Sequence, residues 1–381
     1  MAGPFPANVV GFLSLHSYMP PSNKNEREDI KMLAIYKRMQ KLAQNHPILF
    51  FIAMTYFWSW SFWIPIHIDN LPPGMPLALT FLGVFGPALA GSTLLRLKNE
   101  APIMTVVFGK SFFIGAALAA AAIVMFQMDL LGVTQLIPKD DHRFPVDSPW
   151  YVYLLMALTV FISGLVFSNI QHAAPSIRAV YAGLVPNRKT LLLAVPVILF
   201  LPALIVCANL ITQAAGLPFE PSEFTMQGAS VWLPLMAVKL FTVAMLTGGN
   251  EEHGWRGVLL PILQQRYSPL VATLIIALAW EPWHLPITLD IMEGNPNLVP
   301  ILFARLVAIL PIAFLMTFLY NASRGSIFLC VLLHACFNTQ IKMLAGSGLI
   351  ALFILVTVIV LIIFLKPWRR DRAYTPSPKS S

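Results

Sequence analysis

The sequence predicts an all-α fold: a polytopic transmembrane helical bundle with a polar cavity inside the membrane. Hydrophobic residues make up 57% of the 381 residues and charged residues only 11%, and the mean hydropathy is +0.72. A water-soluble chain of this length is less apolar. A bilayer core about 30 Å thick needs roughly 20 helical residues per crossing, and the chain has enough apolar runs for about eight to ten spans.

The apolar runs follow one another from residue 48 to residue 365. Pro or His interrupts the runs around 257–286 and 326–343. Either segment could therefore be a broken or partial crossing, because a membrane tolerates irregular backbone only where it lines a cavity or is buried in protein. The runs cover residues 48–66, 76–95, 111–132, 150–169, 190–212, 230–247, 270–286, 300–320, 326–343 and 348–365.

A basic leader precedes the first span. It carries no secretory signal, since its short apolar stretch 9–15 has no basic region before it. Residues 30–42 place Met32, Tyr36 and Met39 on one helical stripe, which predicts an interfacial helix or a solvated leader. The predicted segments are a cytoplasmic leader (1–47), N-terminal transmembrane helices (48–229), a core that carries the polar motifs (230–345), a last transmembrane helix (346–366) and a disordered basic tail (367–381).

The charges in the connections predict an orientation. The leader, the tail and the 170–189 connection are basic, whereas the connections 67–75, 213–229 and 287–297 contain acids and no Lys or Arg. Both termini are therefore expected in the cytoplasm, with an even number of spans. The net charge of +8 fits this bias and contact with anionic membrane lipid, and no base-reading pattern indicates nucleic acid.

The three cysteines predict no disulfide framework. Cys207, Cys330 and Cys336 are odd in number and lie in apolar runs. A free Cys in such a run behaves as a small hydrophobe, so no Cys-rich metal site is expected either.

Ionisable residues lie where a membrane disfavours them, and the first such motif is Glu251-Glu252-x-x-x-Arg256. A charge at hydrocarbon depth costs roughly 2.5–3.5 kcal/mol on insertion scales, so these residues indicate a polar cavity. Glu252 and Arg256 are four residues apart and can pair on one helix face, which leaves Glu251 free to act as a general base. The alternative is a charged cap at the membrane interface.

The second motif is Trp280-x-x-x-His284. The indole of Trp280 lies one helical turn before His284 and could brace its imidazole, while Pro282 and Pro286 loosen the backbone there. Glu281 points elsewhere on a helix, as a supporting partner or an ordinary polar contact. The alternative for His284 is a hydrogen-bonded packing residue.

The third motif is His334-x-x-x-Asn338, on an apolar helix whose start is marked by Arg324 and Gly325. Both side chains can donate hydrogen bonds to one cavity, as an oxyanion requires. Two His and a carboxylate could also form an open zinc site. The alternative is a hydrogen bond between helices, worth only about 0.6 kcal/mol in membranes.

Together, the three motifs resemble the CPBP intramembrane protease family, which includes type II CAAX prenyl endopeptidases and bacterial self-immunity proteins. The family pattern is Glu-Glu-x-x-x-Arg, Phe-x-x-x-His and His-x-x-x-Asn, in this order, and Trp280 replaces the Phe here. The resemblance covers about residues 230–345. The segment 85–90, Phe-Gly-Pro-Ala-Leu-Ala, is a weaker match to an early family helix.

The resemblance implies a conical intramembrane cavity in which Glu251 and His284 activate water and His334 and Asn338 support the oxyanion. Glu252, Arg256 and Trp280 would be structural. The implied substrate is a hydrophobic or prenylated peptide. No cofactor is certain: whether a metal takes part is open on the resemblance, and Glu251, His284 and His334 could bind Zn with a free fourth position. The implied location is the endoplasmic reticulum membrane of a eukaryote or the plasma membrane of a bacterium.

Two other functions remain open at this stage. The same acid, base and amide groups could cyclise or isomerise an isoprenoid-like or lipid small molecule, because family membership does not fix the reaction. The chain could also be a non-catalytic membrane immunity or chaperone-type protein that retains these residues for packing.

Overall fold

A computed structural model describes residues 24–101, 108–127, 148–222, 228–289 and 298–376. These residues form helices joined by turns and contain no strand, which confirms the all-α prediction. In the first half of the chain the helices are α2 (Lys24–Asn45), α3 (Pro47–Trp63), α4 (Met75–Val84), α5 (Gly86–Lys98), α6 (Lys110–Gln127), α7 (Trp150–Ser168), α8 (Pro175–Tyr181) and α9 (Arg188–Ala214).

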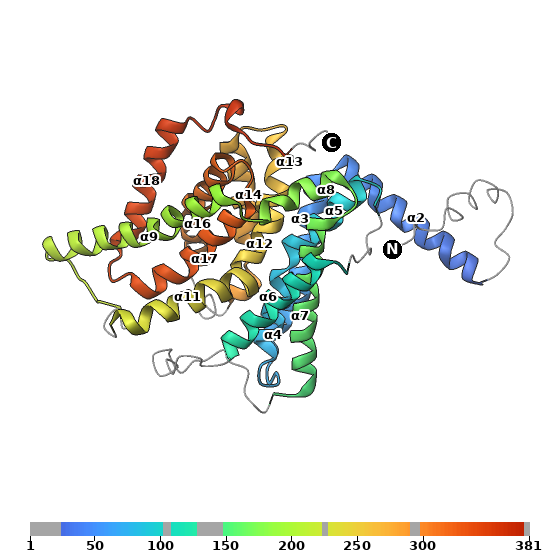
Figure 1. Cartoon of the computed structure of the whole chain (residues 1–381), viewed down its shortest axis with the longest axis horizontal. Helices are drawn as coiled ribbons and strands as arrows, with labels where there is room; N and C mark the ends of the chain where they lie inside the picture. Colours follow the sequence, from blue (N-terminus) through green and yellow to red (C-terminus); the bar gives the residue numbers. More distant parts are fainter. Residues whose placement is uncertain (1–23, 102–107, 128–147, 223–227, 290–297, 377–381) are drawn as a thin grey trace.

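The second half contains the helices that carry the motifs. They are α11 (Ala229–Leu246), α12 (Gly248–Gly254), a π-helical turn (Trp255–Leu259), α13 (Leu260–Gln264), α14 (Pro269–Trp283), α16 (Leu298–Ala322), α17 (Ile327–Leu344) and α18 (Leu349–Leu365). Figure 1 shows α2 projecting away from the bundle formed by the other helices.

The chain is an integral membrane protein. Among the described residues, seven helices are long and apolar enough to cross a membrane, and three apolar helices of 10–17 residues accompany them. Each of the ten predicted apolar runs overlaps one of these helices, but the run predicted to end at 247 continues to Gln264, and residues 128–132 of the run 111–132 lie outside the described part. The long spans are Pro47–His67, Met75–Lys98, Trp150–Gln171, Arg188–Ala214, Trp232–Gln264, Val299–Ala322 and Ile327–Leu344, and the shorter helices are Lys110–Phe126, Pro269–Trp283 and Leu349–Leu365.

The first motif lies inside a span, not at its end. Residues Trp232–Gln264 form one long apolar segment. Thr247 interrupts its helix with φ −132° and ψ −121°, and the helix resumes at Gly248 as α12. A π-helical turn then follows at Trp255–Leu259. Such π-turns are rare and occur frequently at functional sites.

Helix α12 occupies the middle of the bundle, packed between α5 and α17 (Figure 1). Two glycines permit the close approach of α5 and the α12 segment. A Cβ at Gly254 would overlap the backbone of Pro87, and a Cβ at Gly91 would lie 2.9 Å from Cγ2 of Val258. Small residues allow helix backbones to pack tightly in membranes. The segment 85–90 thus begins the helix on which the first motif rests.

The leader contains the expected helix. Tyr36 and Met39 of α2 pack against the core, whereas Met32, the third residue of the predicted stripe, is 65% exposed. The position of this helix relative to the membrane surface stays a prediction, as does the cytoplasmic location of both termini.

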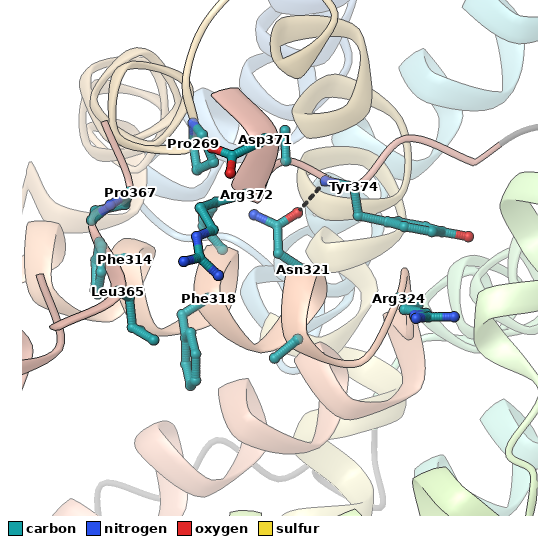
Figure 2. Close-up of a pocket in the computed structure, with 13 residues that line it drawn as sticks. Pro269, Phe314, Phe318, Asn321, Arg324, Leu365, Pro367, Asp371, Arg372 and Tyr374 are labelled. Atoms are coloured by element: carbon teal, nitrogen blue, oxygen red, sulfur yellow. Dashed lines mark hydrogen bonds between the residues drawn. The ribbon is translucent and has the colours of Figure 1, made fainter. Parts of the chain in front are cut away.

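The C-terminal tail differs from the expected disordered segment 367–381 in its described part. Residues 366–376 cross the ends of α13, α14 and α16. The backbone N–H of Tyr374 donates to Oδ1 of Asn321 at 2.9 Å (Figure 2), and its carbonyl accepts from Nε2 of Gln264 at 3.0 Å. The composition of the tail indicates no such partners, because both lie in distant helices. Residues 377–381 lie outside the described part.

Candidate active site

A buried ion pair anchors the candidate site. Glu252 and Arg256 have no exposed side-chain surface, and NH1 of Arg256 donates to Oε1 of Glu252 at 3.0 Å. The same oxygen accepts from Nδ1 of His334 at 2.8 Å, so α12 and α17 are joined through one carboxylate. The predicted i, i+4 pair is present. Its bond to His334, 82 residues further on, was not predicted.

Glu251 points to a different side of α12 and meets α14. Its Oε2 accepts from the indole Nε1 of Trp280 at 2.6 Å and lies 3.9 Å from Nε2 of His284. The second distance is too long for a hydrogen bond. Two polar atoms this far apart can both bond to one water that lies to the side of the line joining them, so a water here would be bound by a base and an imidazole at once.

Trp280 contacts four groups of the site: Glu251, Arg256, His284 and His334. Its ring covers the guanidinium of Arg256, with Cζ 4.5 Å from the ring centroid, and its edge meets the His334 ring at 5.4 Å between centroids. It also lies 5.9 Å from the His284 ring, as the predicted bracing requires. A Phe could supply the ring contacts, but only Trp supplies the N–H that binds Glu251.

His284 directly follows α14, which ends at Trp283. Nδ1 of His284 lies 2.9 Å from the carbonyl oxygen of Trp280, an acceptor, so Nδ1 carries the hydrogen and Nε2 faces Glu251 with its lone pair. Its ring is also flanked by Trp63, at 6.4 Å between centroids, and by Trp283, at 4.8 Å.

Helix α3 holds the backbone around His284 from the outside. The hydroxyl of Tyr56 donates to the carbonyl of Ala279 at 2.7 Å, and the indole of Trp60 donates to the carbonyl of Trp283 at 3.0 Å. Prolines 282 and 286 have no N–H and weaken the helical ladder here. The side chains of α3 supply hydrogen bonds to this part of the backbone.

His334 and Asn338 meet at Gly248. A Cβ at Gly248 would lie under 3.0 Å from Nε2 of His334 and 2.7 Å from Nδ2 of Asn338. Nδ1 of His334 is bonded to Glu252, so Nε2 is the ring nitrogen that faces Gly248. His334 is buried, whereas Asn338 is exposed.

All four predicted catalytic residues belong to one cluster. Glu251 bonds to Trp280 and lies 3.9 Å from His284. The Trp280 ring also contacts His334. His334 and Asn338 both lie against Gly248. Glu281 does not join them: it pairs with Arg305 of α16. Sequence reasoning missed Gly248, Tyr56 and Trp60. The Gly-Gly pair before Asn250 was a visible signal for Gly248, while Tyr56 and Trp60 had none in a span rich in aromatics.

Several buried polar atoms near the site have no protein partner among the described residues. They include Oε2 of Glu252, Nε and NH2 of Arg256, and Nε1 of Trp283. His253, which follows the Glu pair, has neither ring nitrogen bonded and packs edge-on against Phe167. Unsatisfied buried groups of this kind are bonded to water in most proteins.

The residues of the site do not form a ready metal centre. Within the described part of the chain, no three His, Cys, Asp or Glu side chains are grouped so that they could hold a metal ion. Oε2 of Glu251 is bound by Trp280, and Glu252 is bound by Arg256 and His334. Zinc binding by Glu251, His284 and His334 stays a prediction.

Comparison with known proteins agrees with this geometry. Residues 232–340 match the family described as type II CAAX prenyl endopeptidase Rce1-like. The chain is also 26% identical over 208 residues to CAAX prenyl protease 2 of Methanococcus maripaludis, a match that covers 51% of this chain and 74% of that protein.

The fold and these matches define a membrane peptidase similar to the CAAX proteases. The resemblance expected from the three motifs is confirmed for this segment: residues 232–340 are similar to the CPBP/Rce1-like family. All three motifs lie within the matched segment.

Proposed function

We propose that the protein is an intramembrane endopeptidase that hydrolyses a peptide bond in a prenylated or otherwise hydrophobic peptide. The observation that carries the proposal is the 3.9 Å distance between Oε2 of Glu251 and Nε2 of His284, which is short enough for one water beside the two atoms to bond to both. The Rce1-like segment and the similarity to a CAAX prenyl protease support a peptide substrate.

In the proposed reaction, Glu251 takes a proton from the water while its oxygen attacks the carbonyl carbon of the scissile bond. His284 holds the water through Nε2. The resulting tetrahedral intermediate collapses when the carbon–nitrogen bond breaks and the proton passes from Glu251 to the leaving amine. The reaction consumes one water and one peptide bond, releases a carboxylic acid and an amine, and needs no other reactant.

The oxyanion would lie against Nε2 of His334 and Nδ2 of Asn338, the side-chain atoms that face Gly248. Nδ2 of Asn338 donates a hydrogen bond in every protonation state. Nε2 of His334 accepts when the ring is neutral, because Nδ1–H is used by Glu252, and donates only when the ring carries a second proton. Glu252 would then be its counter-ion. We therefore assign Asn338 as the permanent donor and His334 as a donor in the imidazolium form.

The proposal is tested with purified full-length protein and a fluorogenic farnesylated peptide. Glu251→Gln and His284→Ala are expected to retain the thermal stability of the wild type and to lose at least about 100-fold in kcat, as removal of a general base does. Glu281→Gln is the control, since Glu281 belongs to the neighbouring α14 but pairs with Arg305. Equal loss in all three variants would contradict the assignment.

The products separate the other functions. Turnover of an isoprenoid lipid without peptide cleavage would replace the proposal by small-molecule chemistry. Retention of the biological activity by Glu251→Gln would instead indicate a non-catalytic role.

A further inference from the structure

A polar pocket of about 560 Å³ lies away from the catalytic cluster. It is formed by α8, the start of α9, the turn between α16 and α17, and the tail. Its polar lining includes Arg178, Asn187, Thr190, Arg324 and Ser326. None of the catalytic residues borders it.

The pocket carries positive charge without a matching acid. No Asp or Glu is present among the described residues that line it. Arg178 uses NH1 to bind the carbonyl of His172 at 3.2 Å, which leaves its other donors available. Burial first, then the charges of Arg96 and Arg178, lower the pKa of His172, as expected beside a positive potential.

Arg324 is held in a strained conformation at this pocket. Its φ of +56° lies in the left-handed region, which a non-glycine residue adopts only at an energetic cost. Within the described part of the chain its guanidinium has no hydrogen bond or ion pair, and Figure 2 shows it well away from Asp371. Such outliers are found preferentially at ligand clamps.

The surroundings of the pocket are those of a membrane boundary. The span Arg188–Ala214 begins beside it and the span Val299–Ala322 ends beside it. From the pocket, α9 continues with an exposed apolar surface that includes Leu191, Leu192 and Val195, which are 53%, 66% and 56% exposed. Polar donors thus adjoin a surface suited to acyl chains.

We propose that the Arg178–Arg324 pocket binds the phosphate headgroup of an anionic membrane phospholipid, with the acyl chains along the start of α9. Arginine binds phosphate through paired N–H donors, and the buried Ser326 and Thr190 border the same pocket. The proposal does not depend on the peptidase reaction. The charge pattern predicts that this end of the bundle faces the cytoplasmic leaflet, where anionic lipids concentrate.

The test is native mass spectrometry of the full-length protein in detergent, titrated with phosphatidic acid, phosphatidylserine or phosphatidylcholine. The wild type is expected to bind the two anionic lipids at least about tenfold more tightly than phosphatidylcholine. Arg178→Gln/Arg324→Gln should remove that preference. Arg188→Gln/Lys189→Gln, on the same basic segment but outside the lining, should keep it.

Arg324→Gly separates a loss of lipid binding from a loss of folding. Glycine tolerates the left-handed region, so this variant should be at least as thermally stable as the wild type and should still bind anionic lipid several-fold more weakly. Equal binding by the Arg178/Arg324 variants and the wild type would overturn the proposal. So would equal loss in the Arg188/Lys189 control, or full displacement of the lipid by inorganic phosphate at an equal concentration.

Discussion

The indole Nε1 of Trp280 donates to Oε2 of Glu251 across 2.6 Å, while the face of the same ring covers Arg256. One side chain therefore fixes the proposed base and shields the cation of the neighbouring ion pair. The sequence pattern assigned Trp280 only to His284. The Trp280 ring contacts His284 as well, but its single side-chain N–H donates to Glu251.

Trp280→Phe should lower kcat by about 10- to 100-fold, because a hydrogen bond to a charged group contributes about 1.5–3 kcal/mol. The ring contact with Arg256 is retained, so the thermal stability should fall by no more than this hydrogen bond contributes. Trp283→Phe is the matched control on the same helix, since its Nε1 has no partner among the described residues. Steady-state kinetics on both variants measures the difference. An equal loss of kcat in Trp283→Phe would show that the hydrogen bond from Trp280 to Glu251 is not the cause.

Glu252→Gln and Arg256→Met should each destabilise the protein by about 3–5 kcal/mol, because either change leaves a fully buried partner charge uncompensated. Glu251→Gln should instead fold normally and lose activity. The yield of folded protein and its melting temperature measure the difference. If Glu251→Gln unfolds while Glu252→Gln is as stable as the wild type, the two roles are reversed.

Gly248→Ala should abolish most activity although it removes no polar group. Its new Cβ would overlap Nε2 of His334 and Nδ2 of Asn338, so both proposed oxyanion donors would have to move. We expect kcat to fall at least about 100-fold, as after loss of one oxyanion donor. Gly348→Ala is the control, because nothing lies within 4 Å of its Cβ position. An active Gly248→Ala enzyme would place the oxyanion elsewhere.

Tyr56→Phe should reduce kcat by several-fold and leave KM nearly unchanged, since its hydroxyl holds the backbone that orients His284, and a neutral hydrogen bond contributes about 0.5–1.5 kcal/mol. Tyr153→Phe, on the exposed face of α7, should have no effect. A rise in KM alone would show that Tyr56 acts on substrate binding instead.

The sequence predicted the contacts that depend on helical spacing and missed those that depend on packing. Glu252–Arg256 and Trp280–His284 are four residues apart, so helix geometry alone places each pair on one face. The bond from His334 to Glu252 joins residues 82 apart, and its existence depends on how α17 lies against α12. No pattern in one sequence contains that information.

The same reason explains the other differences. The apolar runs predicted the helices because the bilayer imposes length and hydropathy on each span. The tail lacks such a constraint, so its composition indicated disorder, whereas its ordered part depends on Gln264 and Asn321 in distant helices. The role of Gly248 likewise depends on the two side chains that face it.

Gln264 and Asn321 bind the backbone of Tyr374, a contact that we call the clasp and that sets the order in which parts of the protein fold. Residues 366–376 are the last described part of the chain to leave the ribosome, so α13, α14 and α16 must be inserted and packed before the clasp can form. Gln264 and Asn321 also bond to each other at 2.8 and 3.1 Å, and this amide pair does not need the tail. Tail docking is thus a final step of biogenesis, and a premature stop codon after Lys366 would leave a membrane-inserted bundle that never completes it.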